Sequence, residues 1–255
     1  MAFLFDFSTE FEVTIHRLHL PRLDAAFNGY RLAQISDFHI GQWDNTRYLQ
    51  AAIELVNQQK PDLIALTGDF VSYDARDCAK LLAQALPNLN APDGVLAVLG
   101  NHDYPHRLCR LREVLQNAGV RELRNSAHTL RRATAALHFV GVDTSGCYHD
   151  DLPAAMRGLP AEGAAILLAH EPDFADFSSA TGRFDLQLSG HSHGGQLRFP
   201  AIGALYYPRR ARKYPLGLYQ VNEMKLYTNR GVGQAHIPLR LNCRPEVSVF
   251  DLQGA

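Results

Sequence analysis

The chain has 255 residues, of which 46% are hydrophobic and 20% charged, and it contains 19 Gly and 13 Pro. This balance is ordinary for a globular protein and excludes a disordered chain, a collagen or a coiled coil. Twenty-five Lys and Arg stand against 26 Asp and Glu, which leaves a formal net charge of −1. A general nucleic-acid binder usually carries a basic surplus, so the charge argues against that class and leaves room only for a local basic patch.

No segment of the sequence is apolar over the roughly 20 residues that a membrane-spanning helix needs. The first seven residues are largely apolar, but they lack a basic start and are interrupted by Asp6, so we expect no signal peptide. The cysteines show no Cys-x-x-Cys spacing, which favours free thiols in a reducing compartment; they are Cys78, Cys109, Cys147 and Cys243. We therefore expect a cytoplasmic protein whose membrane contact, if it has any, is peripheral and at the inner face.

The first half of the chain alternates strands and helices. Strands are predicted at 12–20, 32–36, 63–67 and 95–99, and helices at 45–59, 75–86 and 105–118. The helix at 45–59 has an apolar face formed by Leu49, Ala52, Ile53 and Val56, and Pro61 ends it. The alternation of strand and helix indicates an α/β fold.

After Gly119 the pattern changes to closely spaced strands with few long helices between them. Further strands are predicted at 127–131, 136–142, 164–169, 186–189, 218–221, 225–228 and 247–252. A second sheet packed on the first accounts for them. Since no Pro/Gly/Ser-rich or charge-rich boundary divides the chain, we expect residues 1–255 to form a single domain. Its motifs occupy 37–193, and its C-terminal strands and a substrate-side loop occupy 194–255.

Polar residues that can bind metal ions follow five apolar strands directly. They stand in Asp-Phe-His at 37–39, Gly-Asp at 68–69, Gly-Asn-His-Asp at 100–103, His170 and Gly-His-Ser-His at 190–193. Ligands gather at the carboxyl ends of strands in α/β sheets, because the loops there converge on a rigid frame. In three of the five segments a Gly precedes the polar residue and allows a sharp turn. We therefore expect all five segments to build one site at this edge of the sheet.

The candidate donors are two Asp, one Asn and four His, without a thiolate. They are Asp37, His39, Asp69, Asn101, His170, His191 and His193, with His102 left over. Carboxylate, amide and imidazole donors suit divalent first-row metals such as Mn, Fe, Co, Ni or Zn. Seven donors are more than a single ion draws from a protein, so the set indicates two ions, each with an open position for water or substrate.

The competing interpretation of a lone His or Asp at a strand end is a hydrogen-bonded structural residue or a helix cap. The remaining histidines are assigned to that class; they are His16, His19, His106, His128, His138, His149 and His236. Asp-x-His and Gly-Asp are weak signals, Gly-Asn-His-Asp is stronger, and Gly-His-Ser-His after an apolar strand is stronger still. Five such segments in this order, each behind a strand, favour the metal site over coincidence.

This order of motifs resembles that of the calcineurin-like metallophosphoesterase superfamily. The downstream sequence is similar to that of bacterial membrane-associated phosphodiesterases of the YaeI and YkuE type. The similar segments are Gly-His-Ser-His-Gly-Gly-Gln at 190–196, Thr-Asn-Arg-Gly-Val-Gly at 228–233 and Pro-Leu-Arg-Leu-Asn-Cys-Arg-Pro-Glu at 238–246. The resemblance covers the chain roughly from Arg31 to its end. It implies a four-layer αββα sandwich, in agreement with the two sheets expected from the strand pattern.

The resemblance also implies a role for each donor. The ligands of the first metal would be Asp37, His39 and His193, and those of the second would be Asn101, His170 and His191. Asp69 would be the carboxylate that bridges both ions. His102 would bind no metal and would face the substrate as the catalytic residue.

One position departs from the family pattern. Some members carry an Asp three residues after the bridging Asp, where it orients the catalytic His, and this chain has Ser72 at that position. The sequence offers Asp103 and Asp74 as substitutes for this role and does not choose between them.

The expected function is that of a binuclear phosphoesterase. We expect two divalent ions, with Mn first and Fe, Zn, Ni, Co or Mg as alternatives. The positive charge of two divalent ions exceeds the negative charge of Asp37 and Asp69. The site is therefore expected to attract an anionic phosphate without a basic protein surface. Ions about 3.5–4 Å apart can share a hydroxide that attacks phosphorus in line. His102 can protonate the departing alkoxide, which is worth about 10²–10⁴ in rate. We expect phosphodiesters or pyrophosphates ahead of monoesters, and a small phosphoester as the partner.

Three alternatives remain. A pyrophosphatase of the UDP-2,3-diacylglucosamine type would act on a lipid-linked substrate at the same site. A metal-binding scaffold without turnover would keep the fold, but no ligand position is lost here and His102 is present. A nuclease would use the same metals, and the neutral charge and the lack of a groove with interleaved aromatic and basic residues argue against it.

The segment 194–217 joins the last motif to the following strands and combines apolar with basic residues. An apolar and aromatic stretch at 197–207 is followed by Arg209, Arg210, Arg212 and Lys213. One interpretation is a solvated loop anchored by a few core residues. The other is a lip beside the metals that meets anionic lipid headgroups or a lipid-linked phosphodiester. Basic residues near such a surface contribute roughly 1 kcal/mol each, and aromatic residues suit the interface.

Overall fold

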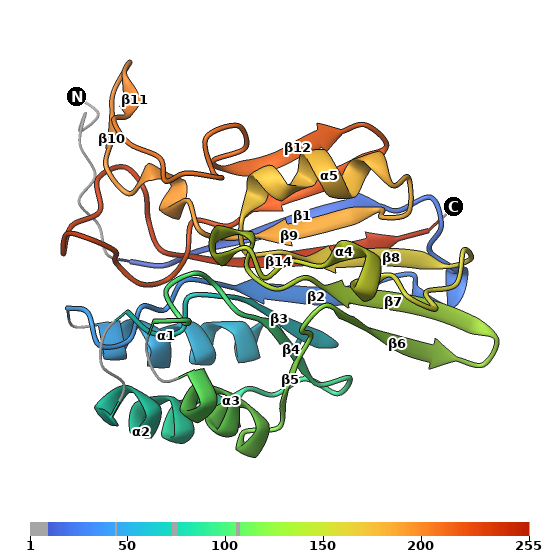
Figure 1. Ribbon diagram of the computed structural model, residues 1–255, viewed down its shortest axis with the longest axis horizontal. Coiled ribbons are helices and arrows are strands. Elements are labelled where there is room, and N and C mark those ends of the chain that lie inside the picture. The colour runs from blue at the N-terminus through green and yellow to red at the C-terminus, as the bar shows by residue number, and fades with distance from the viewer. Residues whose placement is uncertain (1–9, 44, 73–75, 106–107, 255) are drawn as a thin grey trace.

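The computed structural model describes residues 10–43, 45–72, 76–105 and 108–254, and they form four layers. Two six-stranded sheets lie face to face, and helices cover the outer face of each sheet (Figure 1). The αββα sandwich predicted from the strand pattern and the family resemblance is therefore confirmed.

The first sheet has the strand order β1-β14-β2-β3-β4-β5. Its strands are β1 (Glu12–His19), β14 (Glu246–Gln253), β2 (Tyr30–Ile35), β3 (Leu63–Thr67), β4 (Val95–Val98) and β5 (Val120–Glu122). Strands β2 to β5 run parallel, β14 runs antiparallel to β2, and β1 runs parallel to β14. The strand predicted at 247–252 therefore completes the first sheet, although its neighbours in sequence belong to the second.

The second sheet has the order β12-β13-β9-β8-β7-β6. Its strands are β12 (Gly217–Val221), β13 (Met224–Thr228), β9 (Leu186–Ser189), β8 (Ala164–Leu168), β7 (Ala135–Gly141) and β6 (Ser126–Arg132). The four central strands are parallel, and β12 and β6 pair antiparallel at the two edges. A small separate hairpin of β10 (Arg198–Phe199) and β11 (Gly203–Ala204) projects at the upper left of Figure 1.

Helices occupy both outer layers. Helices α1 (Asn45–Gln58), α2 (Arg76–Ala85) and α3 (Leu108–Asn117) cover the first sheet, and the short α4 (Leu152–Ala155) and α5 (Ala175–Ala180) cover the second. Single turns of 3₁₀ helix lie at Ala25–Phe27, Leu86–Asn88, Ser145–Cys147, Pro172–Phe174 and His193–Gly195. The three long helices were predicted, whereas α4 and α5 are too short to show helical periodicity. In the described parts of the chain, no helix combines the length and apolarity needed to cross a membrane.

The strands that carry the motifs are buried on both faces. Along β3, Leu63 and Ala65 pack between the two sheets, whereas Ile64 and Leu66 pack against the helices of the first layer. A strand covered on both sides reads as a continuous apolar run, which is why β3 shows no alternation of polar residues. Burial of each Leu and Ile side chain of this strand contributes about 1.5–3 kcal/mol. The strand ends are thereby held in a rigid frame.

Candidate metal centre

Two groups of buried side chains lie where strands of both sheets end. The first group is Asp37, His39 and His193, and the second is Asp69, His170 and His191; within each group the donor atoms lie within 4.8 Å of one another. The first combines the loops after β2 and β9, and the second those after β3, β8 and β9. The structure thus brings together six of the seven donors predicted from the sequence.

Asp69 lies between the two groups. Its Oδ2 is 3.1 Å from Nε2 of His170 and 3.5 Å from Nε2 of His39. In the first group, Nε2 of His193 is 2.9 Å from Nε2 of His39 and 3.4 Å from Oδ1 of Asp37. The Asp69 carboxylate therefore lies within 3.5 Å of a donor atom from each group.

Backbone carbonyls fix the orientation of two imidazoles. Nδ1 of His170 lies 2.7 Å from the carbonyl oxygen of Thr67, and Nε2 of His191 lies 2.9 Å from that of Arg209. A histidine that donates one ring N–H to a carbonyl presents the other ring nitrogen with a free lone pair, which is the usual arrangement of metal-binding histidines.

The serine at the position that departs from the family pattern supports a candidate ligand. The Ser72 hydroxyl is buried and bonds to Nδ1 of His39, which leaves Nε2 of His39 facing the donors. Ser72 therefore orients the imidazole of His39.

Asp103 is also occupied with a task other than orienting His102. Its buried carboxylate accepts four backbone N–H groups, from residues 69–71 and from Gly100, at 2.8–3.1 Å. These bonds tie the loop after β3 to the loop after β4. The second residue considered for the orienting role, Asp74, lies outside the described residues.

Five candidate ligands have left-handed backbone conformations. Their φ angles are 56° for Asp37, 49° for His39, 55° for Asp69, 68° for His191 and 51° for His193. A non-glycine residue in a sparsely populated conformation costs about 1–3 kcal/mol, and such strain is concentrated at functional sites. The rigid strands before these residues keep them in place at that cost.

The glycines before the motifs serve close approach more than turning. A Cβ on Gly100 would lie 2.1 Å from Oδ1 of Asp69, and one on Gly190 would lie 2.3 Å from Oδ2 of Asp37. Neither glycine has a positive φ, in contrast to Gly68 at 92°. The sharp turns were predicted at these glycines, but it is largely the candidate ligands themselves that have the positive φ angles.

The electrostatics of the centre favour a cation. Burial, together with the charge of Asp69, raises the pKa of Asp37 to about 7 and that of Asp103 to about 8. Burial also lowers the pKa of His39 to about 3 and holds that of His193 well below its ordinary value. Neutral imidazole is the form that binds metals, and a cation beside the crowded carboxylates offsets the cost of burying their charge.

One orphaned polar atom supports the fit of the donors to metal ions. Oδ1 of Asn101 is buried and has no hydrogen-bond partner among the described residues. Leaving a buried polar group unsatisfied costs about 1–3 kcal/mol. This atom belongs to the donor set predicted from sequence, and the set of oxygen and imidazole donors suits divalent ions.

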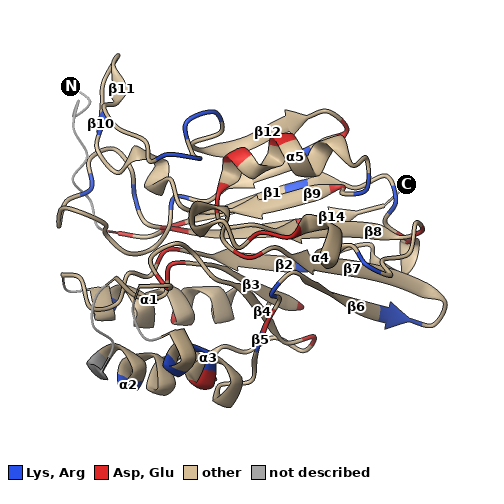
Figure 2. Cartoon of the chain, viewed as in Figure 1, with Lys and Arg blue, Asp and Glu red and all other residues tan. Residues whose placement is uncertain are grey.

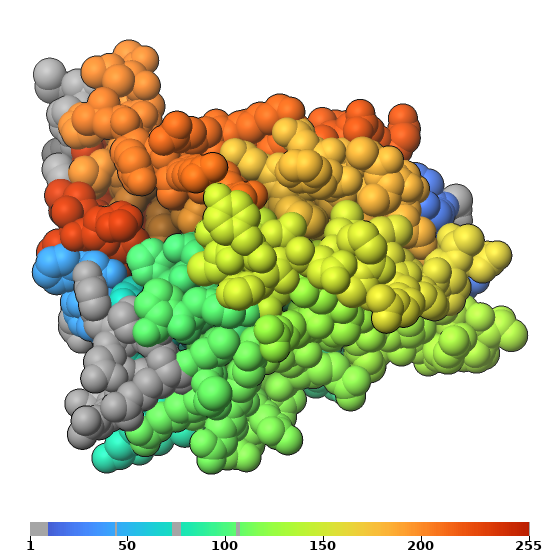
Figure 3. All heavy atoms as spheres, viewed as in Figure 1, coloured from blue at the N-terminus to red at the C-terminus, as the bar shows by residue number. Residues whose placement is uncertain are grey.

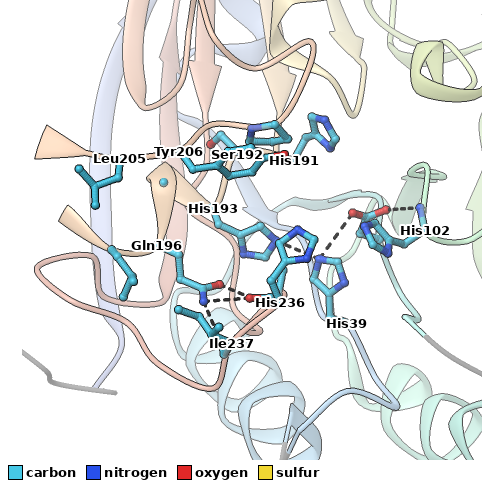
Figure 4. A pocket seen from close by; sticks show the side chains of 15 residues that line it. His39, His102, His191, Ser192, His193, Gln196, Leu205, Tyr206, His236 and Ile237 are labelled. Carbon is cyan, nitrogen blue, oxygen red and sulfur yellow. Dashed lines mark hydrogen bonds and ion pairs between the residues drawn. The ribbon is translucent and has the colours of Figure 1, made fainter.

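His102 lies beside the donors but belongs to neither group. Its ring centroid is 4.9 Å from that of His39, and its backbone N–H donates to Oδ1 of Asp69 at 2.9 Å. Its side chain lines a cavity of about 180 Å³ together with His39, Asp69, His191 and His193 (Figure 4).

Glu171 was not singled out by the sequence analysis, although it follows the candidate ligand His170. Its buried carboxylate accepts the backbone N–H groups of Ser145 and Gly146 at 3.0 and 2.8 Å. A Cβ on Gly146 would lie 3.1 Å from Cβ of Asn101, so this turn packs directly against Asn101. Glu171 therefore positions Asn101 through the turn. The only sequence signal was an acidic residue next to a motif histidine.

His236 lies at the site although its sequence context placed it among the structural histidines. It is exposed, lines the same cavity, and its ring centroid is 6.3 Å from that of His102. No strand ends directly before it, because β13 ends at Thr228, and its position between the similar segments at 228–233 and 238–246 was the only available signal.

Comparisons with known proteins identify the family. Residues 30–195 match the family model of the calcineurin-like phosphoesterases. The phosphodiesterase YaeI of Escherichia coli is 34% identical over 246 residues, which cover 95% of this chain and 88% of YaeI. The metallophosphoesterase YkuE of Bacillus subtilis is 32% identical over 246 residues, which cover 95% of this chain and 86% of YkuE. The chain belongs to the calcineurin-like phosphoesterase family and is a metal-dependent phosphoesterase with a dinuclear centre for divalent metal ions.

Solved structures share the fold. The sulfate thiohydrolase SoxB of Thermus thermophilus aligns with a TM-score of 0.55 and 16% identity, over 86% of this chain and 57% of SoxB. The NAD nucleotidase of Haemophilus influenzae aligns with a TM-score of 0.52 and 13% identity, over 80% of this chain and 45% of that protein. At these identities the likeness concerns the fold alone.

Proposed function

We propose that the protein hydrolyses phosphodiesters, and pyrophosphates second, at two metal ions held by the seven predicted donors. The observation that carries this proposal is the pair of buried triads with Asp69 between them. Asp37, His39 and His193 would hold one ion. Asn101, His170 and His191 would hold the other. Asp69 would contact both.

Bound metal ions would lower the pKa of water so that hydroxide is available at neutral pH, and they would offset charge on the phosphoryl oxygens. The protein holds the donors rigidly through the left-handed ligand conformations and the backbone bonds of Asp103. We propose Mn as the native metal, because oxygen and imidazole donors without thiolate suit it.

His102 would act as the general acid. It lines the cavity beside the donors without joining either group, and Asp69 fixes its backbone. Its imidazolium would give a proton to the departing alkoxide, a contribution of about 10²–10⁴ in rate.

A lipid-linked substrate is the second candidate, and exposed apolar side chains at the mouth of the cavity favour it. Leu205 and Tyr206 line the cavity and are 71% and 60% exposed. A pyrophosphatase of the UDP-2,3-diacylglucosamine type would be one such activity. A protein with this activity would contact the membrane peripherally through the segment 194–217.

We further propose that the chain works as a single domain over residues 1–255. The proposal is supported by strand pairing: the eight residues of β1, from Glu12, pair with the eight residues of β14, from Glu246. This pairing joins the two ends of the described chain in one sheet.

Hydrolysis of bis(p-nitrophenyl) phosphate by the Mn-loaded protein tests the proposed function. We expect release of nitrophenolate from this diester, and slower release from p-nitrophenyl phosphate. A protein that binds Mn but hydrolyses neither compound would be the scaffold without turnover.

A further inference from the structure

The wall of the cavity opposite His39 and His102 is apolar. Its side chains include Leu197, Leu205, Tyr206, Pro208 and Ile237, and Figure 4 shows Leu205 and Tyr206 across the cavity from His39 and His102. Among the described residues that line the cavity, none is Lys or Arg. One side of the cavity can therefore bind charge through metals, whereas the other side offers aliphatic and aromatic surface.

Gln196 assembles this wall from two separate segments. Its Nε2, which has two N–H groups to donate, lies 2.9 Å from each of the carbonyl oxygens of Ala235, Ile237 and Leu239, and its Oε1 accepts the N–H of Ala235 at 2.9 Å. All these contacts come from one buried side chain. The loop at 235–239 is thereby fixed against the segment that begins at 197, and the two lie side by side at the left of Figure 3, in red and orange.

The wall comes from outside the region that carries the metal motifs. The family model matches residues 30–195, and Leu197, Leu205, Tyr206 and Ile237 all follow that region. The part of the chain that holds the metal donors is therefore distinct from the part that forms the apolar wall, so the wall can set specificity independently of the chemistry.

We propose that this wall receives an apolar alkyl or aryl substituent of the phosphoester whose phosphate lies at the metal donors. The proposal rests on the proposed function, since the donors fix the phosphate and the cavity continues from them to the wall. Leu205 and Ile237 are 71% and 40% exposed, so a substituent that covers them removes apolar surface from water. A further phosphate would find no Lys or Arg on this wall.

Calorimetry with inert phosphonates tests the subsite without turnover. Methylphosphonate and hexylphosphonate share the anionic head and differ by five methylenes, each of which gives up to about fourfold in affinity when fully buried. We expect the Mn-loaded protein to bind hexylphosphonate at least about tenfold more tightly. The double variant Leu205→Asn, Ile237→Asn should lose this preference and keep its affinity for methylphosphonate. Leu218→Asn is the matched control, since Leu218 is 47% exposed on β12 and does not line the cavity.

A parallel assay compares hydrolysis of 4-nitrophenyl methyl phosphate with that of 4-nitrophenyl hexyl phosphate, which have the same leaving group. Equal affinities of wild type for the two phosphonates, or an equal loss of preference in Leu218→Asn, would overturn the subsite. A retained preference for hexylphosphonate without any turnover would support the subsite and contradict the proposed function alone.

Discussion

Oδ1 of Asp69 accepts the backbone N–H of His102 at 2.9 Å, while Oδ2 of the same carboxylate lies 3.1 Å from Nε2 of His170. One side chain from the loop after β3 therefore sets the position of the loops after β4 and β8. This arrangement ties the candidate general acid to the candidate metal donors, so a change at Asp69 disturbs both.

Asp69→Asn should reduce turnover more than loss of any other single donor. The amide keeps the shape of the side chain but loses the charge that both groups of donors share. Loss of a residue that only hydrogen-bonds to a metal ligand lowers metal affinity by about 10–100-fold. We expect Asp69→Asn to lower metal affinity by more than this. Elemental analysis and turnover with bis(p-nitrophenyl) phosphate measure the effect. Two tightly bound metals and most of the wild-type turnover in this variant would refute the assignment.

His102→Ala should keep both metals and slow turnover by about 10²–10⁴-fold. The loss should be greatest for poor leaving groups, because they depend most on proton donation. His191→Ala serves as the control that loses a donor. Should the metal content of His102→Ala fall to that of His191→Ala, His102 would have to be counted among the ligands.

Much of the fold and of the donor set could be predicted from local sequence. A strand buried on both faces appears in the sequence as an unbroken run of apolar residues. Such runs stand before Asp37, Asp69 and His170, so they predicted both the strands and the positions of the donors that follow them. The apolar wall could not be predicted in this way. Gln196 contacts carbonyls 39 to 43 residues further along the chain, and no local pattern encodes such a pairing. The pairing of β14 with β1 and β2 is hidden for the same reason.

Vesicle flotation tests the lipid contact of segment 194–217. Part of its basic charge is used within the protein: Nζ of Lys213 lies 2.6 Å from Asp176, and the guanidinium of Arg210 lies 5.1 Å from the ring centroid of Tyr148. Figure 2 shows this basic loop beside α5, the helix that carries Asp176.

We expect wild type to float with anionic vesicles. A variant with Gln at all four basic positions, 209, 210, 212 and 213, should float less, because a basic residue at such a surface contributes at most about 1 kcal/mol. If neither protein binds the vesicles, the lipid contact is refuted and a soluble substrate is the remaining interpretation.

Stability at acid pH should depend on the ion pair between the buried Glu246 and the partly buried Arg230. Burial would raise the pKa of Glu246, but the Arg230 guanidinium at 2.8 Å and hydrogen bonds from Tyr227 and Thr14 hold it below its ordinary value. The folded pKa is the lower one, so the carboxylate stabilises the fold above the unfolded pKa near 4.5. This stabilisation is lost as the pH falls through the folded value.

Urea unfolding with chelator present measures this contribution. Glu246→Gln should lower the free energy of unfolding by about 1–3 kcal/mol at pH 7, since Arg230 keeps its ion pair with Glu12 at 2.9 Å, and the gap to wild type should close as the pH falls below about 4.5. A gap that stays constant from pH 7 to pH 3 would show that the charge of Glu246 is not the source of the effect.

Titration of Mn²⁺ into the metal-free protein tests the central claim most directly, with bound metal and hydrolysis of bis(p-nitrophenyl) phosphate followed in the same samples. Two groups of donors that share Asp69 predict that hydrolysis rises to its maximum as the second Mn²⁺ binds to each chain. Full hydrolysis with one Mn²⁺ bound, or none with two bound, would contradict the account.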